Sequence, residues 1–304
     1  MARGYVPLLL LVAGIWGASF MFIEVAVEEM EPTVVMALRL LLAALVLVPF
    51  LVLQEGARVA FDDVRAAGWG LLFLGFVNAA LPFTLIAWGQ TRIDSSIAAI
   101  ANAPVPLFVA LLAIRFRPSE RARGLRLVGI LLGFLGVGVL AGFNPEGGWW
   151  AVVGTLAATG AALSYAISNL FAQDRYSETQ PLVVVTGSSL AGAFLLAPLA
   201  LAQLPDETPS AKALGAVVAL GVGGTAIALI LYFRMLAGYG ASRASLVTYL
   251  IPLLAVVYGA LLLDEPLTAN AIGGLVLILG GVALGSGLFR YTRRREVVPA
   301  TTRP

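Results

Sequence analysis

Residues 240–284 read GASRASLVTYLIPLLAVVYGALLLDEPLTANAIGGLVLILGGVAL, and they follow the same pattern as residues 94–140, DSSIAAIANAPVPLFVALLAIRFRPSERARGLRLVGILLGFLGVGVL. Small residues, prolines, a glutamate and glycines recur in the same order, with Pro106 and Pro252 lying 146 positions apart. Single matches between apolar segments arise easily by chance. Their shared order and nearly constant spacing predict an internal duplication.

The composition is that of an integral membrane protein. Of the 304 residues, 60% are hydrophobic and only 12% are charged, and the mean hydropathy is +0.95, whereas soluble domains contain about 25% charged residues. A bilayer-spanning helix takes about 20 mostly apolar residues, and we expect an all-α membrane protein with ten such helices. They are residues 5–26, 32–53, 67–88, 95–114, 124–143, 149–171, 181–203, 213–236, 243–263 and 268–289.

The duplication extends over both sets of five helices. In the earlier helices the spacing is 149, and it pairs Trp16 with Tyr165 and Ser19 with Ser168. Because five is an odd number, the second copy must enter the membrane from the opposite side. Such inverted repeats are typical of transporters, whose substrate site lies near the midplane where the halves meet. We expect a first five-helix repeat over residues 1–146, a second, inverted five-helix repeat over residues 147–290 and a basic cytoplasmic tail over residues 291–304.

Basic residues indicate the orientation, because they concentrate in loops that stay in the cytoplasm. With a cytoplasmic amino terminus, all Lys and Arg residues except Arg39, Arg92 and Lys212 fall in cytoplasmic segments. We therefore expect both termini in the cytoplasm of a bacterium, with the chain in the inner membrane as a multi-pass protein. The positive charge then reflects topology, so we expect no nucleic-acid partner.

One charge, Arg39, lies inside the apolar run VVMALRLLLAA. Seven residues into its helix, at about 1.5 Å per residue, it lies about 10 Å from the outer boundary. An arginine at the bilayer centre costs about 3 kcal/mol or more unless it is offset. We expect an ion pair with Glu24, near the outer end of the first helix; reaching outward to water and binding a substrate carboxylate are the alternatives. The second repeat has Ser188 and Gln173 at these positions, so the fold itself does not require the pair.

Three segments resemble the EamA-type family of the drug/metabolite transporter superfamily: GIWGASFMFIE, ALRLLLAALVLVP and GASRASLVTYLIPLLAVVYGALLLDEPLT. The resemblance covers about residues 10–287. It implies a ten-helix carrier with a central cavity lined mainly by helices 1, 3, 4, 6, 8 and 9, and export of metabolites or amino acids is common among members. The loop RFRPSER departs from the family pattern, with Ser119 where glycine is usual.

Polar and aromatic side chains inside the spans are the candidates for a substrate site, because polar groups there must find partners away from lipid. Trp16, Ser19 and Phe20 share one face of the first helix, and the sixth helix repeats this stripe. The alternative for the stripes is ordinary packing, with each serine bonded to its own backbone. The expected substrate-binding residues are Trp16, Ser19, Phe20, Asn78, Asn102, Tyr165, Ser168, Asn169, Tyr232, Ser245, Thr248 and Tyr249.

Asn78 and Asn102 are the strongest single candidates, because a primary amide has donors and an acceptor that its own helix cannot fully satisfy. Hydrogen bonding between helices is the alternative role. Helices 4 and 9 each carry a proline beside their polar face, at Pro106 and Pro252. Since a proline within a helix frees a carbonyl and permits bending, we expect both to act as hinges.

Glycines four positions apart occur in helices 5 and 10, at Gly129 with Gly133 and at Gly281 with Gly285. This spacing permits close contact between helices. We expect the contact within one chain rather than between two chains. The chain is then a monomer or a weak homodimer.

We expect a transporter of small molecules that exports amino acids or related metabolites by alternating access. A multidrug or nucleotide-sugar carrier of the same superfamily is the alternative. The chain has no histidine and no cysteine, so the usual metal ligands and nucleophile–base pairs are absent, and we expect no enzyme activity, metal or cofactor. Glu24 is the one carboxylate clearly inside an expected span, which favours facilitated diffusion over proton coupling.

The inverted topology is testable with reporter fusions. A reporter at Gly147 should lie outside the cell and one at Ser119 inside, because one expected span, residues 124–143, separates the two positions. Paired fusions to alkaline phosphatase and to a fluorescent protein measure this. Both positions on the same side of the membrane would rule out the inverted repeat.

Overall fold

The computed structural model describes residues 4–116, 124–142 and 148–285, and in these ranges the chain is helical, with short connections and no strand. The expected reporter positions Ser119 and Gly147, and the basic tail, lie outside the described residues. The first half contains α1 (Tyr5–Val27), α2 (Pro32–Glu55), α3 (Ala57–Ala67), α4 (Gly70–Leu74), η1 (Gly75–Ala80), α5 (Leu81–Gln90), α6 (Ser95–Asn102), α7 (Val105–Phe116) and α8 (Leu125–Ala141).

The second half repeats this succession of long and interrupted helices. It contains α9 (Gly148–Arg175), α10 (Pro181–Ala202), α11 (Ala211–Val218), η3 (Ala219–Ile227), α12 (Ala228–Tyr239), α13 (Ala241–Ala244), α14 (Val247–Leu262) and α15 (Ala269–Gly285). Within the described residues, seven helical runs are long and apolar enough to cross a membrane, and three shorter apolar helices accompany them. Each overlaps one of the expected segments. The all-helical membrane architecture is therefore confirmed.

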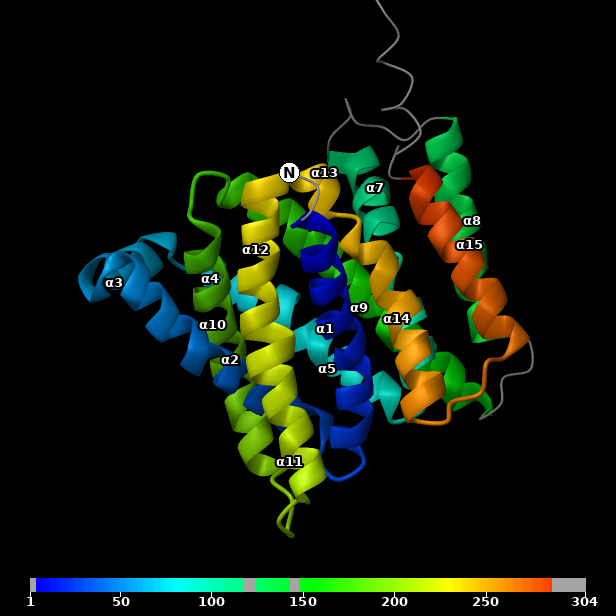
Figure 1. Cartoon of the computed structure of the whole chain (residues 1–304), viewed down its shortest axis with the longest axis horizontal. Helices are drawn as coiled ribbons and strands as arrows, with labels where there is room; N and C mark the ends of the chain where they lie inside the picture. Colours follow the sequence, from blue (N-terminus) through cyan, green and yellow to red (C-terminus); the bar gives the residue numbers. More distant parts are fainter. Residues whose placement is uncertain (1–3, 117–123, 143–147, 286–304) are drawn as a thin grey trace, which may run out of the picture.

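The largest helix contacts join the first half of the chain to the second. α8 packs on α15, α2 on α10, α1 on α14 and α5 on α9. Figure 1 shows the result, with α1 between α12 and α14. The two halves interleave rather than form separate bundles, so any site between them is built from both.

Two π-helical segments, η1 and η3, interrupt the helical runs that cover residues 70–90 and 211–239. Pro82 is the second residue of α5, one position beyond Leu81, and its missing N–H breaks the regular ladder at the end of η1. In η3, three glycines and Thr225 lie within the segment itself. A Cβ on Gly75 would lie 2.6 Å from the Cβ of Ala191, and one on Gly221 would lie 2.8 Å from the Arg39 carbonyl oxygen. η1 is thus tight against α10 and η3 against α2. π-Helical turns are frequent at functional sites.

The helix α3 lies between two of the expected spans, residues 32–53 and 67–88, where no helix was expected. Its residues Ala60, Val64 and Ala67 recur at helical spacing and form one apolar face, which packs on α2 and α10. The remaining face carries charges of both signs. In Figure 1, α3 lies at the edge of the bundle beyond α2.

The packing of α8 on α15 follows from the expected glycine pairs. A Cβ on Gly281 would lie 2.5 Å from the Gly133 nitrogen and 2.6 Å from the Gly129 carbonyl oxygen. The backbones of the two helices are therefore in direct contact within one chain, as expected. Figure 1 shows the two helices side by side.

This contact predicts a difference between two neighbouring glycines. Gly281→Ala should destabilise the protein by about 1–3 kcal/mol, because overpacking forces backbones apart. Gly280→Ala is the matched control, since a Cβ there meets only a leucine methyl at 3.8 Å. Thermal unfolding of both variants in detergent measures the effect. Equal melting temperatures would show that the α8–α15 contact is not close packed.

Candidate functional site

The charged group buried inside the bundle is the guanidinium of Arg39 on α2, whose residue is only 6% exposed. Its Nε donates a hydrogen bond to Thr225 Oγ1 at 2.9 Å. Its guanidinium carbon lies 3.9 Å from the centre of the Phe83 ring. Arg39 therefore joins helices of both halves, with α5 from the first and η3 from the second.

The π-helical segment η3 explains how Thr225 reaches Arg39. Close approach at Gly221 brings η3 against the backbone of α2. Thr225 also donates its hydroxyl proton to the Leu220 carbonyl oxygen at 3.0 Å, five residues earlier. That bond leaves the lone pairs of the hydroxyl oxygen for the guanidinium. Sequence reasoning missed Thr225 and Phe83, which look like ordinary residues of apolar helices.

Glu24 has a different partner from the one expected. Its Oε2 accepts a hydrogen bond from Gln90 Nε2 at 3.0 Å, and the same nitrogen donates to the Phe20 carbonyl oxygen at 2.8 Å. Among the described residues, the expected Arg39–Glu24 ion pair is not formed. The reason is that a neutral side chain from a neighbouring helix serves each charge, Thr225 for Arg39 and Gln90 for Glu24. Gln90 itself is buried, with 3% of its surface exposed.

A second set of contacts joins η1 and α5 to α9. Ser168 Oγ donates to Asn78 Oδ1 at 2.7 Å. The rings of Phe83 and Tyr165 meet edge to face, with centroids 6.4 Å apart. The expected residues Asn78, Tyr165 and Ser168 are thus brought together, and Phe83 connects them to Arg39. We call Arg39, Phe83, Tyr165 and Thr225 the central cluster.

The stripe on α1 faces the second half of the chain. The rings of Trp16 and Tyr232 lie 5.2 Å apart. Ser19 donates to the Ile15 carbonyl oxygen at 3.0 Å, and a Cβ on Gly224 would lie 2.5 Å from Ser19 Oγ. α1 therefore packs beside η3 and α12, and α9 packs beside η1. The two stripes, which are 149 residues apart in the sequence, thus each lie next to the π-helical segment of the other half.

The remaining expected residues lie apart from these contacts. Asn169, Ser245 and Thr248 are exposed, and Thr248 bonds the Ser245 carbonyl oxygen. Tyr249 is half-buried, with its hydroxyl 3.4 Å from the Val282 carbonyl oxygen. None of these four belongs to the central cluster.

The fourth apolar helix is interrupted between α6 and α7. Asn102 ends α6, and its Oδ1 is buried without a hydrogen-bond partner among the described residues. The interruption lies at residues 103 and 104, because Pro104 cannot continue the ladder of α6. Pro106 lies in the first turn of α7, whereas Pro252 is buried inside α14. Pro104 is therefore the residue that breaks this helix, and it was not among the expected hinges.

At the end of the bundle that holds the α1–α2 connection, polar contacts cross between the halves. Glu265 accepts from Ser95 N at 2.9 Å, Ser95 Oγ at 2.5 Å and Ser96 N at 3.0 Å. Its carboxylate thus caps the amino terminus of α6, where a negative charge is favoured. Thr33 also donates to Gln203.

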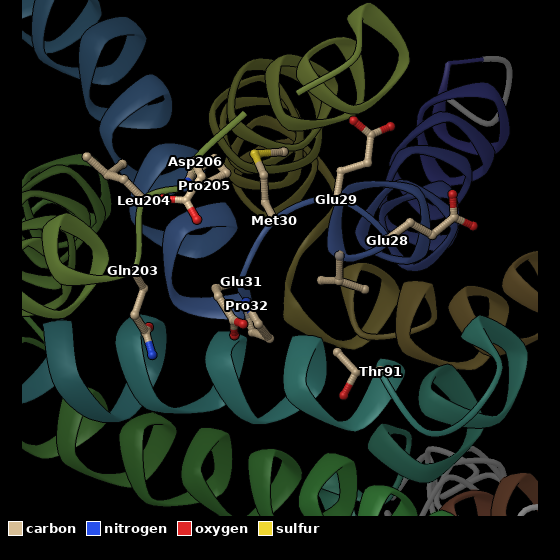
Figure 2. A pocket seen from close by; sticks show the side chains of 11 residues that line it. Glu28, Glu29, Met30, Glu31, Pro32, Thr91, Gln203, Leu204, Pro205 and Asp206 are labelled. Atoms are coloured by element: carbon tan, nitrogen blue, oxygen red, sulfur yellow. The ribbon is translucent and has the colours of Figure 1, made fainter. Parts of the chain in front are cut away.

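A pocket of about 510 Å³ opens at this same end, between the α1–α2 and α10–α11 connections. Figure 2 shows Glu28, Glu29, Glu31 and Asp206 around it. Hydrogen bonds from the Ser210 backbone and side chain to Glu29 lower the pKa of that carboxyl. No group of acidic residues within the described ranges could hold a metal ion. The pocket is lined by none of the central cluster.

Known proteins share both the sequence and the arrangement of this chain. The sequence profile of the EamA-like transporter family matches residues 4–142 and 152–287. The chain belongs to this family. A solved crystal structure superposes on this EamA-like transporter with a TM-score of 0.66, covering 95% of this chain and 100% of the other at 22% identity. At that identity the likeness shows the fold.

Two curated relatives place this EamA-like transporter in its setting. The "Probable amino-acid metabolite efflux pump" of Escherichia coli (strain K12) is 28% identical over 310 residues, 98% of this chain and 99% of that protein. The "Uncharacterized inner membrane transporter YedA" of the same strain is 28% identical over 284 residues, 90% of this chain and 89% of that protein. The protein is therefore a membrane transporter for small molecules, and a multi-pass protein of the bacterial inner membrane.

The capping contact of this transporter predicts a stability effect. Glu265→Ala should lower the free energy of unfolding by about 1.5–3 kcal/mol, the range for hydrogen bonds to a charged group. Glu207→Ala, which removes an exposed acid from the α10–α11 connection, is the control. Thermal unfolding in detergent compares them. A loss no greater than that of the control would show that the contacts to Ser95 and Ser96 do not hold α6 in place.

Proposed function

We propose that this transporter exports amino acids or related metabolites from the cytoplasm by alternating access. The observation that carries the proposal is the central cluster, a buried cation with aromatic neighbours at the junction of the two halves. Amino acids combine a carboxylate with apolar groups, and such a cluster suits both. The name of the E. coli relative, a probable amino-acid metabolite efflux pump, supports the same substrate class.

The proposed architecture is ten membrane-spanning helices in two inverted repeats, residues 1–146 and 147–290, with both termini in the cytoplasm. The matching placement of the π-helical segments supports it. η1 packs on α10 of the other half, and η3 packs on α2 of the other half. An inverted repeat would produce this exchange of partners, because each half presents its third helix to the second helix of its counterpart. We propose that one chain suffices for transport.

The substrate site is proposed at and around the central cluster. Trp16, Ser19, Asn78, Ser168 and Tyr232 lie on the helices that carry or border it. Asn102 adds a buried oxygen without a partner among the described residues. A substrate group or a water could donate to it. Phe20, Asn169, Ser245, Thr248 and Tyr249 remain predictions of the sequence alone.

Alternating access requires contacts that form on one side of the site while the other side opens. The contacts of Glu265 with α6 and of Thr33 with Gln203 cross between the halves at one end. By the proposed orientation this is the external end. We propose that these contacts separate when the site opens outward, with η1 and η3 as the places where their helices bend.

Counterflow in liposomes tests the function. Liposomes that contain the purified protein are loaded with unlabelled amino acid at about 1 mM, the upper end of usual enzyme KM values. They should take up the same amino acid, labelled and supplied outside at a lower concentration, transiently and saturably. Empty liposomes are the control. If none of the twenty amino acids gives counterflow while nucleotide sugars or cationic drugs do, the substrate class is wrong.

The energy source can be tested in the same liposomes. Transport should persist without a pH gradient, because Glu24, the one carboxylate expected clearly inside a span, is held by a hydrogen bond from Gln90. Glu24→Gln should keep at least about half of the counterflow rate, since an amide replaces the carboxylate at similar volume. Accumulation driven by a pH gradient in the wild type and lost in Glu24→Gln would instead identify Glu24 as a proton carrier.

A further inference from the structure

We propose that Arg39 binds the carboxylate of the transported molecule, so that substrates are carboxylates and the matching amines are excluded. The inference rests on the proposed substrate site and deepens it by naming the group that is recognised. It also replaces the expected role of Arg39 as the partner of Glu24. The observations that carry it are the burial of Arg39, its available N–H groups and the placement of its neighbours.

The first observation concerns charge. Arg39 is 6% exposed at membrane depth, where an uncompensated cation is unfavourable. None of the described carboxylates forms an ion pair with it; Glu24, the acid expected there, is bonded to Gln90. Thr225 is neutral, and stacking on Phe83 compensates only in part. An anionic group of the substrate would supply the missing charge each time the site is occupied.

The second observation concerns the hydrogen-bonding groups. Thr225 takes the Nε donor, which holds the plane of the guanidinium in one orientation. The two terminal nitrogens carry four further N–H donors, and no described residue accepts from them. Two parallel N–H groups match the two oxygens of a carboxylate. A site held in this way is already oriented before the substrate arrives.

The third observation concerns the rest of the ligand. Phe83 covers one face of the guanidinium at 3.9 Å, and Tyr165 meets Phe83 edge to face. An apolar side chain attached to the bound carboxylate would pack against these rings. Ser188 takes the position of Arg39 in the second repeat. The charge therefore belongs to one side of the site only, as expected for a residue that recognises one end of an asymmetric ligand.

The test measures binding to the purified full chain in detergent by isothermal titration calorimetry. The ligands are the twenty amino acids, two acids without an amine (3-phenylpropionate and 4-methylpentanoate) and two amines without a carboxylate (phenethylamine and isopentylamine). Carboxylates should bind the wild type at least about 30-fold more tightly than the matching amines. Arg39→Gln should remove this preference, a loss of about 2 kcal/mol for a buried charge pair.

Two further variants separate recognition from a structural role. Arg39→Lys keeps the charge but loses the planar pair of donors, so it should weaken carboxylate binding about tenfold and leave a preference of about threefold over amines. Arg92→Gln is the matched control, because Arg92 stacks on Trp88 at the same 3.9 Å but outside the cluster. Its affinities should equal those of the wild type.

The stability of the ligand-free protein gives an independent readout. If Arg39 has no anionic partner until a carboxylate binds, the ligand-free Arg39→Gln variant should melt at the same temperature as the wild type or higher. The substitution removes a buried, unpaired charge. A large loss of stability in Arg39→Gln, together with unchanged carboxylate affinity in Arg39→Lys, would make Arg39 a structural residue and overturn the proposal.

The outcomes distinguish this inference from the proposed function. Binding of 3-phenylpropionate that depends on Arg39, without binding of any amino acid, would support the inference and refute amino-acid export. Equal binding of amines and carboxylates, with amino acids transported, would leave export standing and overturn the inference. Failure of every carboxylate to bind would overturn both.

Discussion

Close contact between helix backbones is the constraint on which this structure depends. In a bilayer, lipid tails are as apolar as leucine, so helices associate through packing and hydrogen bonds rather than through exclusion of water. Here the contacts between the halves run through glycine. Gly75 meets α10, Gly221 meets α2, and Gly281 meets α8. At each, a single added carbon would overlap a backbone or side-chain atom of the other half.

The polar residues of the central cluster are a consequence of this packing. Because η3 lies directly on α2, the hydroxyl of Thr225 reaches a guanidinium that would otherwise need to extend to water. Where α9 packs on η1, Ser168 reaches Asn78 in the same way. In both of these hydrogen bonds, the two partners come from opposite halves of the chain. Relative movement of the halves would therefore change these hydrogen bonds, which couples the site to the state of the bundle.

Sequence reasoning predicted the helical membrane architecture, because long apolar runs and a repeated order of residues determine it. It also predicted the close contact of α8 and α15, because glycines four residues apart indicate where two helix backbones can come into contact. It included Trp16, Tyr232, Asn78 and Ser168 among the candidate site residues. It did not predict that Trp16 contacts Tyr232 or that Ser168 bonds Asn78. It expected the wrong partner for Arg39, because the choice between Glu24 and Thr225 depends on which helix lies closest. No local pattern in the sequence contains that information.

The amphipathic helix α3 has a consequence for how the bundle can move. It follows α2 after the single residue Gly56, whose φ of 87° makes a sharp turn. Its charged face, with Arg58 and Asp62, belongs at the level of the lipid headgroups. A contact of this face with the headgroups would fix the depth of this end of α2 in the bilayer. Arg39 lies 16 residues before Glu55, the last residue of α2, which is about 24 Å along the helix axis. A helix anchored in this way would tilt rather than move along its own axis. The Arg39 guanidinium would then stay at one depth in the bilayer while the helices around it change their orientation.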